Sequence, residues 1–205
     1  MSGTGAAGGP RQLGMTEVKR LNRGWRRQTS ARIALLLDSV GQPYNVGSII
    51  RTAAAFGVGH AWLCGDTAAP GHPSARKTAL GTDRLLTFGY PESVTAGIAA
   101  ARADGYTVVA VELASGARPL HALPLDGDVC LALGNEDHGC SAALLAGADA
   151  VGYIPQVGKV GSLNVAAAAA IAIAEVRRRE WAGADADAGA DADEAAEAGA
   201  TAPPD

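Results

Sequence analysis

The chain has 205 residues, enough for one compact domain with extensions at its ends. Hydrophobic residues make up 48% of it but aromatic residues only 4%, so aliphatic side chains must fill the core. Its three cysteines, Cys64, Cys130 and Cys140, form no CxxC pair, which argues against a disulfide framework and against a zinc site. No leader and no long unbroken apolar run is visible, so we expect a cytoplasmic protein that avoids membranes and binds no metal.

The net charge of −4 is unevenly distributed. Residues 183–205 hold seven acidic side chains and no Lys or Arg, and without them the chain has 17 basic and 14 acidic residues, a net charge of +3. Seven basic residues against one acid lie in 11–32. The chain therefore has a basic front, a nearly neutral body and an acidic tail.

Composition predicts four parts. Residues 1–10 are rich in Gly and Ala, and the tail 182–205 lacks large apolar side chains, so we expect both to be disordered. Between them lie a basic N-terminal extension, 11–32, and a folded domain, 33–181.

The basic extension has two possible roles. With Trp25 it could bind RNA phosphates and stack a base, the contacts coming from Arg20, Arg23, Arg26 and Arg27. Alternatively it is an amphipathic helix that packs on the body through Leu13, Val18, Leu21 and Trp25.

Short apolar runs alternate with helical patterns in the folded domain, which predicts an α/β fold with a mainly parallel sheet. In chain order we expect a strand at 33–37, a helix at 45–56 capped by Asn45, a strand at 60–64, a short helix at 73–80, a strand at 85–88 and a helix at 92–103. Strands at 107–111 and 129–133 follow, then a short helix capped by Ser141, a strand at 150–154 and a long helix at 162–181.

The last helix is almost entirely Ala, Ile and Val over 165–176, which predicts burial on several sides and permits close approach of a helix from a second copy. Arg177, Arg178 and Arg179 would suit the negative end of its dipole.

Three segments place polar residues and glycines where a strand is followed by a helix, and ligands bind at such carboxyl ends of strands in open α/β sheets. The first is 45–52. Arg51 is the only charge in an otherwise apolar or small helix, so it is either paired with an acid or directed at a phosphate or carboxylate.

The second segment is 131–141, in which Gly134 and Gly139 bracket a tight loop after a buried strand. Glu136 in this loop could be a polar anchor or a base, whereas His138 is expected to be a bystander.

In the third segment, 154–164, a Gly-flanked loop precedes a helix start and can cradle an anion or an adenosine.

Two side chains of this third segment invite different readings. Ser162 suits a helix cap. Asn164 would lie inside the helix, where it has no capping role, so we expect it to contact a ligand or the neighbouring loop.

In this order, the three segments resemble the motifs of the TrmH-like (SpoU) RNA ribose methyltransferases of the SPOUT superfamily. The matching stretches are N-x-G-x-I-x-R-T-A-x-x-F-G from Asn45, G-N-E-x-x-G from Gly134 and I-P-x-x-G-x-x-x-S-L-N-V-A-x-A from Ile154. The similarity covers about residues 33–175, essentially the whole predicted domain.

The resemblance implies a Rossmann-like fold whose C-terminal part forms a deep trefoil knot, in a homodimer whose sites draw on both subunits. S-adenosylmethionine would bind in the knot through Leu133, Gly134, Asn135, Ile154, Gly158, Ser162 and Leu163. Arg51 would be the central catalytic residue, supported by Asn45, Glu136, Ser162 and Asn164.

The expected function is therefore S-adenosylmethionine-dependent 2'-O-methylation of an RNA ribose. The G-N-E form of the second motif and the lack of a separate RNA-binding domain favour tRNA, with guanosine 18 of the D-loop as the candidate nucleotide. Lys77 and Arg84 are further candidates for phosphate contacts. The alternatives are ribosomal RNA methylation, including the antibiotic-resistance type, and a non-catalytic RNA-binding protein. A nicotinamide-binding enzyme is excluded because no GxGxxG follows the first strand.

Overall fold

A computed structural model describes residues 9–200 of the chain, and side chains as far as Gly183. The chain divides at Ser30 into two compact units. The first holds helix α1 (Met15–Arg27), and the second, the α/β unit, holds all the other elements. None of the described helices combines the length and the apolarity needed to span a membrane.

The α/β unit is built on a sheet in which every pairing is parallel, in the order β3-β2-β1-β6-β4-β7-β5. The strands are β1 (Ile33–Asp38), β2 (His60–Cys64), β3 (Thr87–Gly89), β4 (Thr107–Val111), β5 (Arg118–Pro119), β6 (Val129–Leu133) and β7 (Ala150–Tyr153). The predicted mainly parallel α/β fold is therefore confirmed.

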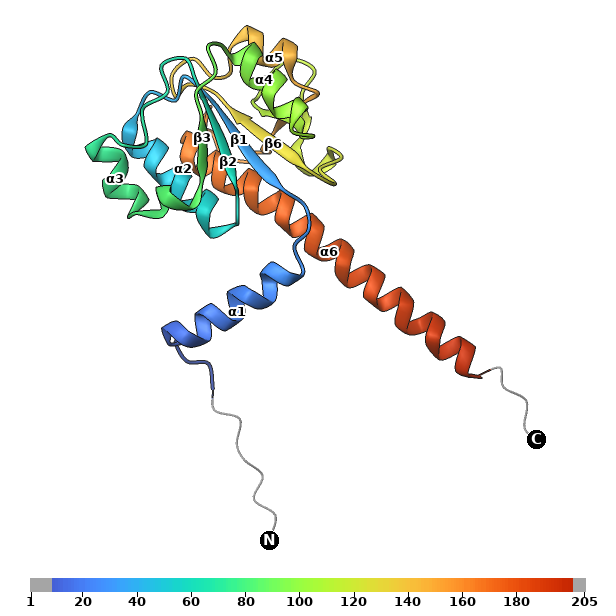
Figure 1. Cartoon of the computed structure of the whole chain (residues 1–205). Coiled ribbons are helices and arrows are strands. Elements are labelled where there is room, and N and C mark those ends of the chain that lie inside the picture. Colours follow the sequence, from blue (N-terminus) through green and yellow to red (C-terminus); the bar gives the residue numbers. More distant parts are fainter. Residues whose placement is uncertain (1–8, 201–205) are drawn as a thin grey trace, which may run out of the picture. The chain divides into compact units, whose positions relative to one another are not determined.

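Helices cover both faces of this sheet (Figure 1). One face carries α2 (Pro43–Ala55), α3 (Pro73–Ala79) and α6 (Val165–Ala200), and the other carries α4 (Val94–Ala103) and α5 (Ala142–Gly147). Two short 3-10 helices, η1 (Thr82–Leu85) and η2 (Leu120–Ala122), complete the unit.

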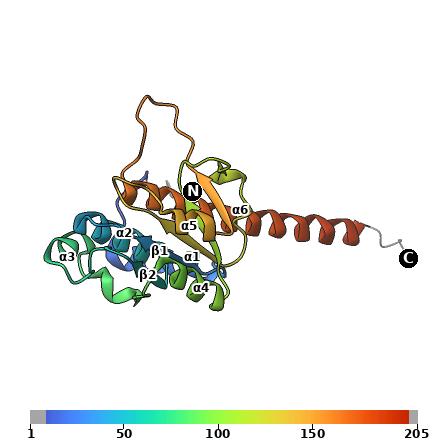
Figure 2. The same cartoon turned by 90° about the horizontal axis from the view of Figure 1, so that it is seen from above.

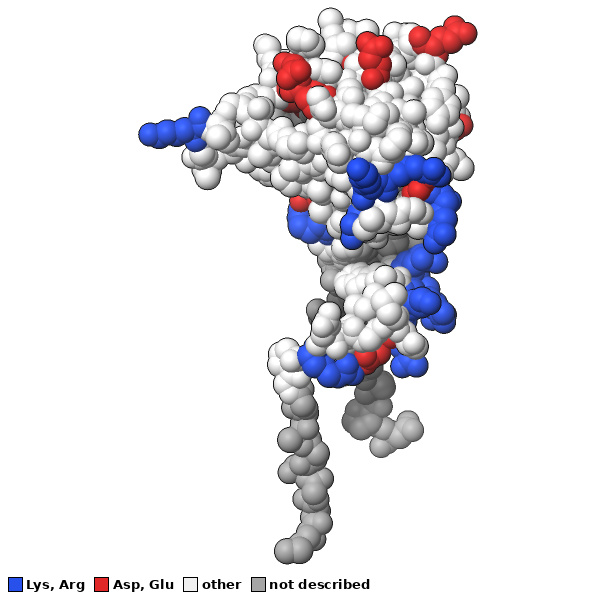
Figure 3. Space-filling model, turned by 90° about the vertical axis from the view of Figure 1, so that its left-hand side faces the viewer, with Lys and Arg blue, Asp and Glu red and all other residues white. Residues whose placement is uncertain are grey.

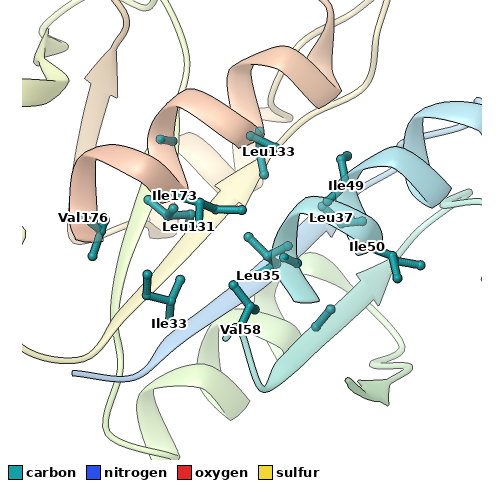
Figure 4. Packing of buried hydrophobic residues seen from close by; sticks show 14 of the residues in the cluster. Ile33, Leu35, Leu37, Ile49, Ile50, Val58, Leu131, Leu133, Ile173 and Val176 are labelled. Atoms are coloured by element: carbon teal, nitrogen blue, oxygen red, sulfur yellow. The ribbon is translucent and has the colours of Figure 1, made fainter. Parts of the chain in front are cut away.

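Strand β1 shows how the sequence produces the two layers. Successive side chains of a strand point to opposite faces, and all six residues of β1 are buried. Ile33, Leu35 and Leu37 pack with α2 and α6 (Figure 4), whereas Ala34 and Leu36 pack with α4 and α5. A continuous apolar run is therefore what a central parallel strand requires.

The predicted strands appear with small shifts, and several details of the prediction were wrong. The strand expected at 85–88 is divided into the end of η1 and β3, and β5, only two residues long, was not expected. Helix α2 begins at Pro43 after the N-cap Gln42, so Asn45 lies in the first turn and is not the cap. Proline at the first helical position explains the earlier start, because its fixed φ suits that position.

Helix α6 begins at Val165, not at Ser162. Asn164 is the capping side chain, because its Oδ1 accepts hydrogen bonds from the backbone N–H groups of Ala166 at 2.9 Å and Ala167 at 3.3 Å. The expectation that Asn164 has no capping role was therefore wrong. The helix continues to Ala200, beyond the expected end near Trp181, which agrees with the high helix propensity of alanine. Disorder of the acidic tail stays a prediction.

Because α6 continues past them, the three arginines do not lie at a helix end, and the predicted dipole role was wrong. Arg177 is 2% exposed and donates to Phe56 O at 3.0 Å, Ala31 O at 2.7 Å and the Glu180 carboxylate at 2.8 Å. This side chain ties α6 to the start of β1 and the end of α2. The opposite side of the helix is open, since Ile171 is 43% exposed, so burial on several sides was only partly right.

Candidate functional site

The carboxyl ends of β4, β6 and β7 and the start of α6 enclose a cavity of about 350 Å³. Its size is that of a small-molecule site. It is lined by Val111, Glu112, Leu113, Leu133, Gly134, Asn135, Glu136, Asp137, His138, Gly139, Tyr153, Ile154, Gln156, Gly161, Ser162, Leu163, Val165 and Ala168.

The charge of this lining restricts the ligand. Three acidic residues, Glu112, Glu136 and Asp137, line the cavity, and its lining contains no Lys or Arg. Phosphate recognition in proteins uses Arg, Lys or several convergent N–H groups. The acidic lining therefore favours a neutral or cationic molecule with an apolar body.

Two glycines shape the loop between β6 and α5. A Cβ on Gly134 would lie 2.2 Å from the backbone N of Cys140, so no side chain fits where this loop crosses itself. Gly139 has φ +69°, and a Cβ there would lie 2.4 Å from Glu112 Oε2. Asn135 and Gly139 pair through two backbone hydrogen bonds of 2.9 Å. The loop is therefore closed on itself and offers a fixed backbone edge to the cavity.

Glu136 anchors this loop to the start of α2. Its carboxylate accepts the backbone N–H groups of Gly41 and Gln42, both at 3.0 Å, and Nδ2 of Asn45 at 2.9 Å. Burial raises the pKa of Glu136, but these hydrogen bonds outweigh that effect and hold the pKa below its ordinary value. A carboxylate so engaged favours the polar anchor among the two expected roles, because its lowered pKa makes it a poor general base.

Asn45 extends the connection to α6. Its Oδ1 accepts a hydrogen bond of 3.0 Å from Nδ2 of Asn164, the residue that caps α6. One chain of hydrogen bonds, Glu136 to Asn45 to Asn164, thus joins all three predicted segments. We call these three side chains the polar clamp. Asn164 contacts a neighbouring segment, as expected, although it reaches α2 and serves as a cap as well.

Glu112 was missed by the sequence analysis. Its carboxylate accepts the backbone N–H of Cys140 at 2.8 Å and that of Leu113 at 2.9 Å, so it supports the glycine-bounded loop from the side of β4. It follows β4 directly, and a polar residue at the carboxyl end of a parallel strand was the signal used for the other segments. The same signal could have identified it.

The predicted site residues fall into two groups. Those that line the cavity are Leu133, Gly134, Asn135, Glu136, Ile154, Ser162 and Leu163. Those outside its lining are Asn45, Arg51, Gly158 and Asn164. Gly158 is exposed in the loop between β7 and α6, which extends outward from the unit in Figure 2.

Arg51 lies on the outer face of α2 and is exposed. It makes no hydrogen bond or ion pair with any residue whose side chain is described. Of the two readings of Arg51, pairing with an acid is excluded within these residues. Its guanidinium is therefore available to a ligand from outside the α/β unit.

The predicted phosphate contacts are all exposed. Lys77 of α3 and Arg84 of η1 are exposed. Figure 3 shows several Lys and Arg side chains on the face of the molecule that it views. In the other unit, α1 buries no residue, and Arg20, Arg23, Arg26 and Arg27 are exposed. Leu21 and Trp25 of α1 are exposed at 50% and 44%.

The cysteines take no part in the site as nucleophiles. All three thiols are buried, and burial raises the pKa of Cys64 to about 11. Burial also raises the pKa of Cys130 and of Cys140. Among the residues with described side chains, no three His, Cys, Asp or Glu gather to hold a metal ion.

Several relatives can now be compared with this geometry. The chain is 34% identical over 137 residues to the 23S rRNA (guanosine-2'-O-)-methyltransferase RlmB of Acinetobacter baylyi, covering 66% of this chain and 55% of the relative. It is 30% identical over 142 residues to the tRNA (guanosine(18)-2'-O)-methyltransferase of Thermus thermophilus, covering 69% and 72%. The chain thus spans about half the length of the first curated relatives it matches.

Solved structures are similar over the same region. The AdoMet-bound rRNA methyltransferase from Sinorhizobium meliloti superposes with a TM-score of 0.68 at 33% identity, covering 74% of this chain and 58% of that one. The SpoU rRNA Methylase family matches residues 32–174, which include the polar clamp, Arg51 and every residue of the cavity lining. This chain belongs to the SpoU rRNA Methylase family.

Proposed function

We propose that this protein transfers a methyl group from S-adenosylmethionine to the 2'-hydroxyl of an RNA ribose. The observation that carries the proposal is the acidic cavity within the family's matched segment, which also contains Arg51, exposed and without a hydrogen-bond or ion-pair partner among the described side chains. RNA 2'-O-methylation is also the activity in the names of the relatives from A. baylyi and T. thermophilus.

The residues of the cavity fit this cofactor. S-adenosylmethionine carries a sulfonium and an ammonium against one carboxylate, so its net charge is positive and complements Glu112, Glu136 and Asp137. Leu133, Ile154 and Leu163 supply apolar walls for the adenosine, and Gly134, Asn135 and Ser162 supply polar edges. When bound, the cofactor supplies an electrophilic methyl group.

The chain's own groups position the RNA hydroxyl and stabilise its developing charge. An in-line transfer depends above all on alignment, to which a rigid polar clamp contributes. Arginine is ordinarily protonated, so we assign Arg51 the role of holding a phosphate or stabilising the developing alkoxide, and not that of a base. Because the sulfonium methyl group is already electrophilic, the transfer itself requires no metal ion.

We further infer a homodimer and a knot. The exposed side of α6 around Ile171 offers an apolar, small-residue face to a second copy, and Arg51 lies outside the cavity lining of its own chain. Both features fit a site shared by two subunits. The knot is supported by the chain path, because β6 is inserted between β1 and β4 and the segment after β7 returns to pack α6 on β6 and α2.

For the RNA substrate, tRNA is our first candidate, because the matched region covers 72% of the T. thermophilus tRNA enzyme. Ribosomal RNA is the second, because identity to the A. baylyi rRNA enzyme is higher, 34% against 30%. Phosphate contacts are assigned to α1 and to Lys77 and Arg84, all exposed. For α1 this role agrees with the absence of any buried residue in the helix.

The test is incubation of the purified protein with methyl-labelled S-adenosylmethionine and, separately, total tRNA and ribosomal RNA. We expect label in one RNA and a 2'-O-methyl nucleoside after digestion. Cofactor binding without transfer to either RNA would favour the non-catalytic RNA-binding alternative. No cofactor binding at millimolar concentration would refute the proposal.

A further inference from the structure

An exposed aromatic side chain stands beside the polar clamp without a structural role. Tyr44 occupies the first turn of α2, is 53% exposed, and makes no side-chain hydrogen bond with the described residues. The next residue, Asn45, belongs to the clamp and bonds Glu136 of the cavity lining. Tyr44 therefore lies next to the site but contributes little to the core.

Tyr44 and Arg51 share the outer face of α2. They are seven residues apart, which is about two helical turns and about 10 Å along the axis. Ser48 lies between them on the same face, and its hydroxyl bonds the backbone O of Tyr44 at 2.9 Å. The inner face of this helix is buried through Val46, Ile49 and Ile50. The outer face thus presents an aromatic ring and an unpaired guanidinium in one row.

Helix α3 adds positive charge along one side of this row. Gly47 permits very close packing there, since a Cβ on it would lie 2.0 Å from Thr78 Oγ1 and 2.1 Å from Ala75 O. Thr78 also bonds the backbone O of Tyr44 at 3.1 Å, which fixes α3 against the start of α2. Arg76 and Lys77 of α3 are exposed. The surroundings of Tyr44 therefore favour a polyanion.

We propose that Tyr44 is a stacking platform for a nucleobase of the RNA substrate, while Arg51 holds a phosphate of the same strand. Proteins bind single-stranded RNA by stacking bases on aromatic side chains and by pairing phosphates with arginine, and this face supplies both groups. The inference rests on the proposed function and adds a residue that selects unstacked, single-stranded nucleotides over paired ones.

The test compares a labelled single-stranded oligoadenylate with an abasic strand of the same length, by fluorescence anisotropy with the full chain. Tyr44→Ala should weaken binding of oligoadenylate about tenfold and leave the abasic strand unchanged. Tyr44→Phe should keep wild-type discrimination, since it retains the ring. Tyr90→Ala is the matched control, because Tyr90 is 68% exposed but lies outside α2 and should not matter.

Three outcomes would overturn the inference: equal weakening for both strands, unchanged discrimination in Tyr44→Ala, or no discrimination by the wild type. Dissociation of a dimer by Tyr44→Ala in sedimentation would assign Tyr44 to a subunit interface and also overturn it. Each of these can occur while the wild type still binds S-adenosylmethionine and methylates RNA. Loss of those two wild-type activities would refute the proposed function instead, so the two failures are distinguishable.

Discussion

The polar clamp and the outer face of α2 are neighbours with opposite properties. In the clamp, Glu136, Asn45 and Asn164 bond one another and the backbone, so their polar atoms are engaged. On the outer face, Arg51 and Tyr44 make no side-chain hydrogen bond with the described residues. The difference indicates that some polar residues of the shared motifs hold the loops in place, whereas others are available to a ligand. Substitutions should therefore separate the two regions by their effects on stability and on methyl transfer.

The largest effect is expected on the outer face. Arg51→Ala removes an unpaired charge but no contact within the described structure, so it should leave the melting temperature and cofactor affinity near wild type. Methyl transfer should fall by at least about a hundredfold, the scale of one lost transition-state contact. Arg51→Lys should not restore it, because an ammonium cannot reproduce the planar fork. If Arg51→Ala unfolds, Arg51 is needed for stability, and the outer face does not differ from the clamp in this respect.

Substitutions in the polar clamp should lower the stability of the protein more than they lower methyl transfer directly. Glu136→Gln replaces an acceptor oxygen by an N–H group facing other donors, which should lower the free energy of unfolding by about 1–3 kcal/mol in urea titrations. Cofactor affinity should fall with it, since Glu136 lines the cavity. Unchanged stability combined with lost transfer would show that Glu136 acts chemically.

The effect of Glu136 on stability should depend on pH. Its pKa is lowered in the folded state, so its stabilisation is present above the ordinary value of 4.5 and is lost as the pH falls through the lower folded pKa. The stability difference between wild type and Glu136→Gln should therefore be constant at neutral pH and shrink on acidification below about 4.5. A difference that grows on acidification would contradict the direction of the shift.

Asn164 allows the cap and the link to Asn45 to be tested separately. Asn164→Ala removes both and should cost about 1 kcal/mol from the cap alone. Asn164→Asp keeps an acceptor for the helix N–H groups but cannot donate to Asn45 Oδ1. We expect it to retain most of the thermal stability while weakening cofactor binding, measured by calorimetry. Equal melting temperatures for the two variants would argue against the cap.

The smallest effect is expected from deletion of the chain after Ala182. Among the residues of α6 whose side chains are described, the buried ones all precede that point: Val165, Ala169, Ala172, Ile173, Val176 and Arg177. Melting temperature and methyl transfer should stay near wild type. If the acidic tail competes with RNA for the basic front, RNA binding should tighten, most clearly at low salt. Loss of folding would show that the domain boundary is wrong.

Most strands followed from apolar runs such as Val129–Leu133, which is buried at every position. Strand β5 could not be predicted, because Arg118 and Pro119 form no apolar run and are defined as a strand only by pairing with β7. The start of α6 was misplaced because Ser162 and Asn164 are both capping types. The contact of Asn164 with Asn45 joins residues 119 positions apart, and a local pattern does not contain such a contact.

The positions of the site residues were predictable where loops follow strands. Their hydrogen-bond partners were not. Glu136 was expected as anchor or base, and its three hydrogen bonds, which only the structure reveals, favour the anchor. Arg51 was expected to pair with an acid or to point at a phosphate or carboxylate, and only the structure shows that no acid with a described side chain pairs with it. Residue type and spacing were enough to identify the candidate site residues, but their contacts depend on long-range packing.

The buried guanidinium of Arg177 has a consequence for how far this protein can be shortened. It is held by a carbonyl before β1, a carbonyl after α2 and the carboxylate of Glu180, and only the last of these carries a compensating charge. A version ending between the two residues would remove the Glu180 carboxylate from the buried cation, and breaking a buried ion pair costs several kcal/mol. Glu180 therefore marks the minimal C-terminus for a stable domain, so trimming or fusion should begin beyond it.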